Sequence, residues 1–128
     1  NEAGIELNQV DYINTHGTST IIGDLAEVKA IQDLFAEHAY NISLTSSKSM
    51  TGHVLGATGA IEAIISVLSM KHSMVTPTIN HEKGDEDPNI DYKLNFTFNQ
   101  AQPREINYAM SNNFGFGGHN ACLLFKRI

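Results

Sequence analysis

Residues 57–72 constrain the fold most strongly, because this predicted helix is apolar around nearly its whole circumference. Its apolar positions include Ile61, Ala63, Ile64, Ile65, Val67, Leu68 and Met70. A helix of this kind is expected to be deeply buried. The chain has 128 residues, enough for one domain and short for two. One sheet cannot cover every face of this helix, so we expect another surface to cover it or the chain to associate.

Around this helix, the pattern alternates strands and helices. A helix over residues 22–37, with Thr20 or Asp24 as a candidate N-cap, follows the first strand. A glycine-rich loop over 46–56 leads into the helix at 57–72, and a solvated loop covers 82–88. Strands are expected at residues 10–14, 42–45, 93–98, 106–112 and 121–126. The order β-α-β-α-β-β predicts an α/β fold with a mixed sheet, parallel where helices cross over and antiparallel at the end.

The composition narrows the class of protein. The net charge of −6 argues against nucleic-acid binding, which usually needs a basic face. Charged residues make up 17% of the chain, below the ~25% typical of globular domains. This indicates that some surface is buried, either internally or against something outside the chain. No apolar run approaches the ~18 residues that a transmembrane helix requires.

Cysteine and metal-ligand patterns give little chemistry by themselves. Cys122 is the only cysteine, so no internal disulfide can form, which fits a reducing, cytoplasmic location. Cys122 lies in an apolar strand and is expected in the core rather than as a nucleophile. The histidines are too dispersed for a metal site, and no phosphate-binding loop of the GxxxxGK[ST] type occurs. We therefore expect no metal and no cofactor.

Two histidines are the first candidates for catalysis. His16 follows the first predicted strand and His53 follows the second, each among small residues such as Gly17 and Gly52. Loops at the carboxyl ends of parallel strands are a usual place for catalytic groups. Each histidine could equally be a structural loop residue, but two in equivalent positions favour a shared site.

Charged residues near these loops form a second group. Lys48 precedes His53 by five positions, and Glu62 lies on the apolar helix where solvent is hard to reach. We expect them to form a buried ion pair, although an ordinary surface pair worth ~0–1 kcal/mol is the alternative. Asp24 and Glu27 share one helix face and are candidates to join this network. The alternative is that both acids only favour the N-terminus of their helix.

A glycine-rich stretch near the C-terminus is the third candidate. Residues 113–120 read Asn-Phe-Gly-Phe-Gly-Gly-His-Asn. Glycines permit positive φ and leave backbone N–H groups open, as an oxyanion hole requires. Most such hairpins are only turns. Composition and spacing alone therefore predict no more than an α/β unit with a two-histidine site.

Three motifs go further and resemble β-ketoacyl-acyl-carrier-protein synthases of the thiolase-like superfamily. The stretch at 14–20, followed by Gly23-Asp24, resembles the first histidine motif of that family. Residues 46–57 resemble its lysine–histidine motif, most closely that of the synthase II type, and 115–120 resemble its C-terminal gate loop. The motifs occur in family order, and the similarity runs from residue 10 to residue 127.

The resemblance implies a fold and a boundary. Family members have two similar halves, and the nucleophilic cysteine lies in the first half. Residues 1–128 would then be a partial C-terminal domain, incomplete at its N-terminus, with residues 1–5 as the end of a helix. The intact protein would be a homodimer that binds acyl- and malonyl-loaded acyl-carrier protein, without nucleic acid or membrane. This chain alone would be inactive.

The resemblance also implies residue roles in a decarboxylative Claisen condensation. The catalytic residues would be His16, His53, Lys48 and Phe116, supported by Asp24, Glu27 and Glu62. Pantetheine or acyl groups would contact Thr18, Thr20, Phe114, Phe116 and Gly117. Some relatives hold a monovalent cation near the positions of Asn14, Glu62, Ser111 and Asn120, which we do not expect here.

Three alternatives stay open from the sequence. One is a cysteine-less, chain-length-factor-type partner subunit, and another is the ketosynthase domain of a polyketide synthase. The third is a non-enzymatic α/β interaction module, in which the two histidines would lie far apart.

Overall fold

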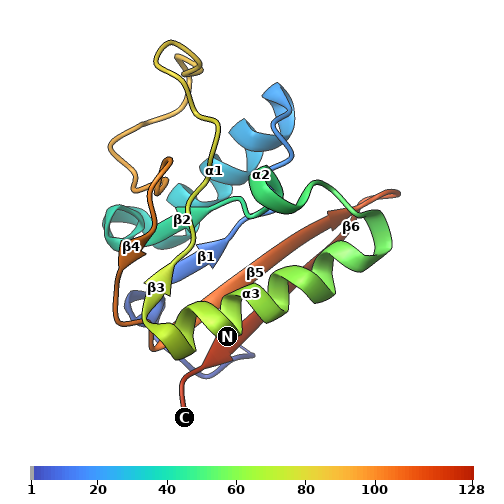
Figure 1. Ribbon diagram of the computed structural model, residues 1–128. Coiled ribbons are helices and arrows are strands. Elements are labelled where there is room, and N and C mark those ends of the chain that lie inside the picture. The colour runs from blue at the N-terminus through green and yellow to red at the C-terminus, as the bar shows by residue number, and fades with distance from the viewer. Residues whose placement is uncertain (1) are drawn as a thin grey trace.

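The computed structural model describes residues 2–128 (Figure 1). Within this range, four strands form one sheet in the order β2-β1-β5-β6. β1 is parallel to both β2 and β5, whereas β5 and β6 are antiparallel. This confirms the predicted mixed sheet. The strands are β1 (Tyr12–Asn14), β2 (Ser43–Thr45), β5 (Tyr108–Gly115) and β6 (His119–Lys126).

Helices cover both faces of the sheet. Adjacent residues of a strand point to opposite faces, so two neighbours on β1 show which helix packs on each face. On β1, Ile13 packs in a cluster with Val28, Ile31 and Phe35 of helix α1 (Ile21–Phe35). Its neighbour Tyr12 packs in a second cluster with Met70 of helix α3 (Thr58–His72). The central strand β1 is therefore buried on both sides, as parallel strands with crossover helices require.

Helix α3 is not deeply buried by residues 2–128: as expected, the one sheet leaves a face of this apolar helix uncovered. Its buried face carries Thr58, Glu62, Ser66, Ser69 and Met70 and contacts β5. The opposite face is exposed and apolar, with Ile64 at 59% exposure beside Val67 and Leu68. Figure 1 shows α3 lying along β5 and β6. Among residues 2–128, nothing covers its outer side, because the sheet lies on one side only.

The segments around these helices differ from the prediction in detail. The first helix ends at Phe35 rather than 37, and residues 36–41 continue as the 3-10 helix η2 (Ala36–Asn41). The loop predicted over 46–56 contains the short helix α2 (Lys48–Thr51) and the start of the 3-10 turn η3 (Leu55–Ala57). A further 3-10 turn, η1 (Leu7–Gln9), precedes β1.

The strand predicted over 93–98 does not form. Asn95 and Phe98 make only isolated bridges, to Ser43 and Thr78, and Thr97 has a positive φ of 49° that no regular strand accepts. A second small sheet, which the sequence pattern does not predict, pairs β3 (Met74–Val75) with β4 (Gln102–Pro103). The solvated loop at 82–88 is largely exposed, as predicted.

Both ends of the chain add smaller corrections. The C-terminal hairpin closes more tightly than predicted, since β5 runs on to Gly115 and β6 begins at His119. Residues 2–3 form a turn rather than the end of a helix, and Asn1 lies outside the described residues. Over residues 2–128, no helix is both long and apolar enough to cross a membrane.

Candidate functional site

The first histidine loop follows β1 and is held by a carboxylate of α1. The backbone N–H groups of His16 and Gly17 each donate to Glu27, at 2.9 Å to Oε1 and 2.9 Å to Oε2. Ser46, which follows β2, donates its hydroxyl to the carbonyl of Gly17 at 2.6 Å. A Cβ at Gly17 would lie 2.7 Å from Cβ of Ser46, so only glycine fits this close approach.

The second histidine loop lies between α2 and α3. The N–H of Leu55 donates to Nδ1 of His53 at 3.2 Å, and the hydroxyl of Thr58 lies 3.1 Å from the same atom. Because Nδ1 accepts from a backbone N–H, the ring proton of His53 resides on Nε2. His53 can therefore donate a hydrogen bond from Nε2.

The two predicted histidines meet in space. The ring centroids of His16 and His53 lie 5.6 Å apart, with their planes at 89°. The ring of Phe114 packs on His16 with centroids 5.2 Å apart. This proximity comes from the parallel sheet, since β1 and β2 are adjacent and both loops leave their carboxyl ends.

His16 is held as a neutral imidazole at neutral pH. Burial lowers its pKa from 6.5 to about 4, with further contributions from the charge of Lys48 and from His53. A neutral imidazole keeps one N–H to donate and one nitrogen to accept. Nδ1 of His16 is buried and has no hydrogen-bond partner within residues 2–128.

Lys48 and Glu62 form the predicted buried ion pair. Nζ of Lys48 donates to Oε1 of Glu62 at 2.5 Å, and both side chains are almost fully buried. Burial raises the pKa of Glu62, while the hydrogen bond and charge of Lys48 oppose that rise. The pair joins α2 to α3 beside the second histidine loop.

Asp24 and Glu27 do not join the Lys48–Glu62 pair by any hydrogen bond within residues 2–128. Glu27 instead binds the first histidine loop, as described above. Asp24 accepts from the backbone N–H groups of Thr20, Ser19 and Thr18, but burial still raises its pKa. Burial likewise raises the pKa of Glu27. Thr20 occupies the N-cap position of α1, although its hydroxyl makes no capping bond.

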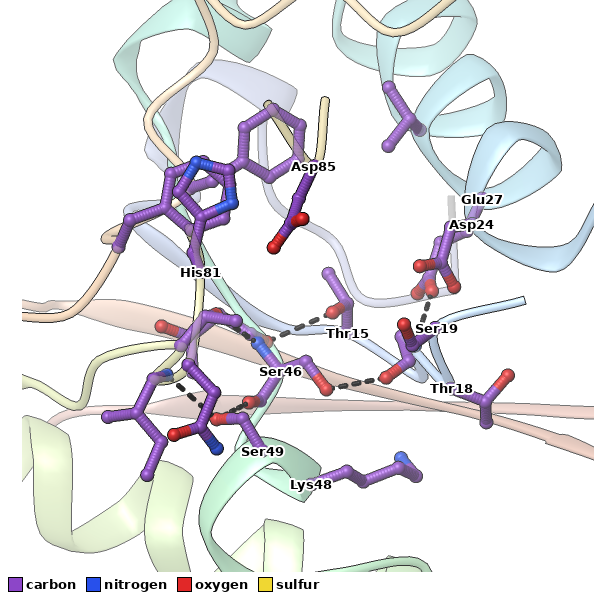
Figure 2. Close-up of a pocket in the computed structure, with 18 of the residues that line it drawn as sticks. Thr15, Thr18, Ser19, Asp24, Glu27, Ser46, Lys48, Ser49, His81 and Asp85 are labelled. Carbon is purple, nitrogen blue, oxygen red and sulfur yellow. Dashed lines mark hydrogen bonds between the residues drawn. The ribbon is translucent and has the colours of Figure 1, made fainter. Parts of the chain in front are cut away.

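Asp24, Glu27 and Lys48 line one cavity of about 470 Å³. Figure 2 shows Asp24 and Glu27 of α1 on one side, and Lys48 of α2 on another. His53 also lines it, as do His81 and other residues of the 78–98 segment. The lining mixes carboxylates and an ammonium group with apolar and aromatic side chains, a composition common in ligand sites.

Within residues 2–128, the other predicted site residues make no ring contact with the two histidines that matches the His16–His53 contact, apart from Phe114. Phe116 lies in the hairpin turn and is 91% exposed, and Phe114 rather than Phe116 contacts His16. Gly117, beside it, has a φ of 83°. The hydroxyls of Thr18 and Thr20 lie 3.4 Å apart at the rim of the first histidine loop.

Cys122 is exposed rather than in the core, so that expectation was wrong. It lies on β6, whose residues from 119 to 123 are all exposed at the edge of the described sheet. Its thiol donates to the side-chain carbonyl of Asn112, its partner on β5. Burial of the sulfur and the charge of Glu27 raise the pKa of this thiol, so it is a poor nucleophile.

Asn14 and Ser111 lie side by side on the sheet beneath α3, next to Glu62 of that helix. Asn14 and Ser111 are partners across β1 and β5, and the Asn14 amide donates to the carbonyl of Glu62 at 3.4 Å. Asn120 is exposed on β6. Within the described range, no group of three or more His, Cys, Asp and Glu side chains could hold a metal ion.

Asn112 is a site residue that is not among the candidates predicted from the sequence. Its amide donates to Oε1 of Glu27 at 3.1 Å and is buried. Asparagine is disfavoured inside strands, so its place in a predicted strand beside a glycine-rich turn was the available signal.

Comparison with known proteins places this geometry in a family. Residues 1–82 match the family model for the beta-ketoacyl synthase C-terminal domain. The chain is 54% identical over 127 residues to 3-oxoacyl-[acyl-carrier-protein] synthase 2 of Staphylococcus aureus strain COL, covering 99% of this chain and 30% of that protein. It is 48% identical over 127 residues to the synthase 2 of Coxiella burnetii, with the same two coverages.

Solved structures share the fold. A beta-ketoacyl synthase from Burkholderia phymatum matches with a TM-score of 0.89 at 38% identity, over 99% of this chain and 30% of that one. A type II polyketide ketosynthase, solved with its acyl-carrier protein and bound to a hexaketide, matches with a TM-score of 0.91 at 35% identity, over 98% and 30%. The fold is that of a thiolase-like ketosynthase, and the chain spans about 30% of the length of these relatives. The match over residues 1–82, together with these relatives, shows that the chain belongs to the β-ketoacyl synthase family, a family of condensing enzymes.

Proposed function

We propose that this chain is the C-terminal part of a 3-oxoacyl-acyl-carrier-protein synthase that elongates fatty acids by decarboxylative Claisen condensation. The observation that carries the proposal is the pairing of His16 and His53, with ring centroids 5.6 Å apart. The buried Lys48–Glu62 pair lies beside them. Synthases of this name share 54% and 48% identity with the chain.

The first chemical step is loss of CO2 from a malonyl thioester. The bond between Cα and the carboxylate breaks and CO2 leaves. The electron pair of that bond moves into the thioester carbonyl and gives an enolate. His16 and His53 stabilise the enolate oxygen by donating hydrogen bonds. The tautomer of His53, with its proton on Nε2, and the low pKa of His16 both favour donation by neutral rings.

The second step joins the two acyl groups. The enolate carbon attacks an acyl thioester on a cysteine outside this chain; a C–C bond forms and the C–S bond breaks, releasing the thiolate. By family resemblance, the N–H of Phe116 and that of the cysteine hold the second oxyanion, and the Phe116 ring gates the acyl pocket. Thr18 and Thr20, at the rim of the His16 loop, bind the pantetheine arm, with Phe114 and Gly117 nearby.

The remaining charged groups hold the site in shape. Glu27 fixes the first histidine loop through two backbone N–H groups. The Lys48–Glu62 pair connects α2 and α3 on either side of His53 and places a positive charge near the His16 ring. Asp24 braces residues 18–20, where the pantetheine arm would pass. No cofactor takes part in this scheme.

We assign partners and location on the same basis. A solved relative is a ketosynthase in complex with its acyl-carrier protein, which supports acyl- and malonyl-loaded carrier protein as partners. The intact protein would be a cytoplasmic homodimer. The chain alone would be inactive, because its only thiol, Cys122, has a raised pKa.

One alternative has a specific observation behind it. Two structural neighbours are described as a ketosynthase with a chain length factor, at 33% and 35% identity. The chain retains both histidines and Lys48, which favours the condensing subunit over a chain-length factor. A non-enzymatic module is disfavoured, because it gives no reason for the two histidines to meet.

The test is a His53→Ala variant of the full-length protein. Losing one donor to the enolate should slow decarboxylation of malonyl-carrier protein ~10²–10³-fold. Acyl loading of the cysteine uses a different oxyanion hole and should continue at the wild-type rate. His72→Ala, at the exposed end of α3, serves as the matched histidine control. A His53→Ala enzyme that condenses near the wild-type rate would make His53 structural and defeat the proposal.

A further inference from the structure

Asn112 links three elements of the site through one buried side chain. It lies on β5 with 6% exposure, and its amide nitrogen donates to Oε1 of Glu27 on α1 at 3.1 Å. Its amide oxygen accepts the thiol of Cys122, its partner across the hairpin on β6. Both ends of the amide are thus engaged, which fixes its orientation.

The Glu27 end of this link reaches the first histidine. Glu27 is buried, and its two oxygens accept the N–H groups of His16 and Gly17 as well as the Asn112 amide. A buried carboxylate depends on such donors to remain ionised. Asn112 is the side chain that completes this set of donors, and it comes from a different element than the loop.

The same strand also contacts the histidine ring. Phe114 lies two residues beyond Asn112, on the same face of β5, and its ring packs on His16 with centroids 5.2 Å apart. His16 is therefore held twice from β5: at its backbone through Asn112 and Glu27, and at its ring through Phe114. The turn beyond, with Gly117 and Gly118 at φ 83°, is not part of this hold.

We propose that Asn112 is a positioning residue that fixes the His16 imidazole relative to the root of the C-terminal hairpin. The proposal rests on the proposed function, in which His16 donates to an enolate. A donor displaced by about 1 Å can lose about 10²-fold in rate, so its backbone must be held firmly. The anchor at Asn112 lies below the hairpin turn, so the hold on His16 does not depend on residues 116–118.

The first test measures backbone exchange in the full-length protein. Asn112→Ala removes the link from β5 to Glu27, so the His16 and Gly17 amides should exchange about tenfold faster, read in peptides that cover residues 15–18. Peptides from α3 should exchange at the wild-type rate, which separates a local effect from general destabilisation. Cys122→Ser is the matched control, since a hydroxyl still donates to Asn112 and should leave the exchange unchanged.

The second test uses pH to restore the link. Asn112→Asp keeps the size of the side chain but sets a carboxylate against Glu27 and removes the donor. As the pH falls, the two carboxylates share a proton and a hydrogen bond between them returns. The decarboxylation rate of Asn112→Asp, relative to wild type at each pH, should therefore rise as the pH falls, whereas Asn112→Ala shows no recovery.

Other titratable groups face this site from several elements. Asp24 lies on the helix of Glu27, Cys122 on β6, and Lys48 and His53 line the same cavity. All are present in wild type as well, so the ratio to wild type at each pH removes their contribution.

The outcomes distinguish this proposal from the proposed function. Unchanged amide exchange at residues 15–18 in Asn112→Ala would overturn the positioning role, as would a flat ratio across pH in Asn112→Asp. If Asn112→Ala does not fold, the Asn112→Asp ratio alone decides. If the wild-type protein does not decarboxylate malonyl-carrier protein, the proposed function fails, while the exchange measurement still tests Asn112.

Discussion

At the scale of single residues, the site depends on charges that the fold has removed from water. Lys48 and Glu62 are buried and meet at 2.5 Å, so neither has solvent to compensate for loss of its partner. Breaking a buried pair by removing one member leaves an uncompensated charge, which is far more costly than losing a surface pair.

Lys48→Ala in the full-length protein should destabilise it by about 3–5 kcal/mol and slow both acyl loading and decarboxylation. Replacing both members, with Lys48→Met and Glu62→Gln, removes the unpaired charge and should recover much of that stability but not the activity. Denaturant unfolding and separate assays of the two steps measure this. Loss of a single step at unchanged stability would contradict a shared role of the pair in holding the site.

His16 gives a pH prediction with a definite sign. Its pKa in the folded protein, about 4, lies below the ordinary 6.5, so the folded state binds this proton less readily than the unfolded chain. Between about pH 6.5 and pH 4, falling pH should therefore reduce the free energy of unfolding. NMR of histidine-labelled full-length protein should show one imidazole with a midpoint near pH 4 that is lost in His16→Gln. A His16 midpoint near 6.5 would show that the ring is not desolvated.

At the scale of elements, helix α3 has an unusual distribution of side chains. The face that packs on the sheet carries Glu62, Ser66 and Ser69, while Ile64, Val67 and Leu68 face outward. Exposed apolar residues continue on η3 with Leu55. Soluble monomers rarely expose apolar patches larger than a few hundred Å², so this face is expected to be covered by another surface.

The isolated 128-residue chain should therefore not behave as a clean monomer. We expect size-exclusion chromatography with light scattering to show association, and a hydrophobic dye to bind. Changing Ile64, Val67 and Leu68 to Glu should reduce both effects, while the same number of changes at exposed polar positions in 82–86 should not. A monodisperse wild-type monomer that binds no dye would indicate a self-contained module.

At the scale of the whole molecule, the parallel strands assemble the site from distant segments. β1 and β2 end side by side, which brings Gly17 and Ser46 together and lets His53, beyond α2, meet His16. The strand β5, parallel to β1, then delivers Asn112 and Phe114 to the same edge. The site is thus a property of the sheet edge rather than of any one motif.

The sequence by itself determined the four strands of the main sheet, the crossover helices, the mixed pairing of that sheet and the identity of the histidine, lysine and acidic candidates. Those follow from local periodicity and from motifs whose residues are close in the chain. Only the tertiary structure decided which groups meet: Glu27 binds the His16 loop rather than Lys48, Phe114 rather than Phe116 packs on His16, and Cys122 is exposed. These contacts depend on strand register and on which face of an element is covered, and both are set by packing between distant segments that no local pattern encodes.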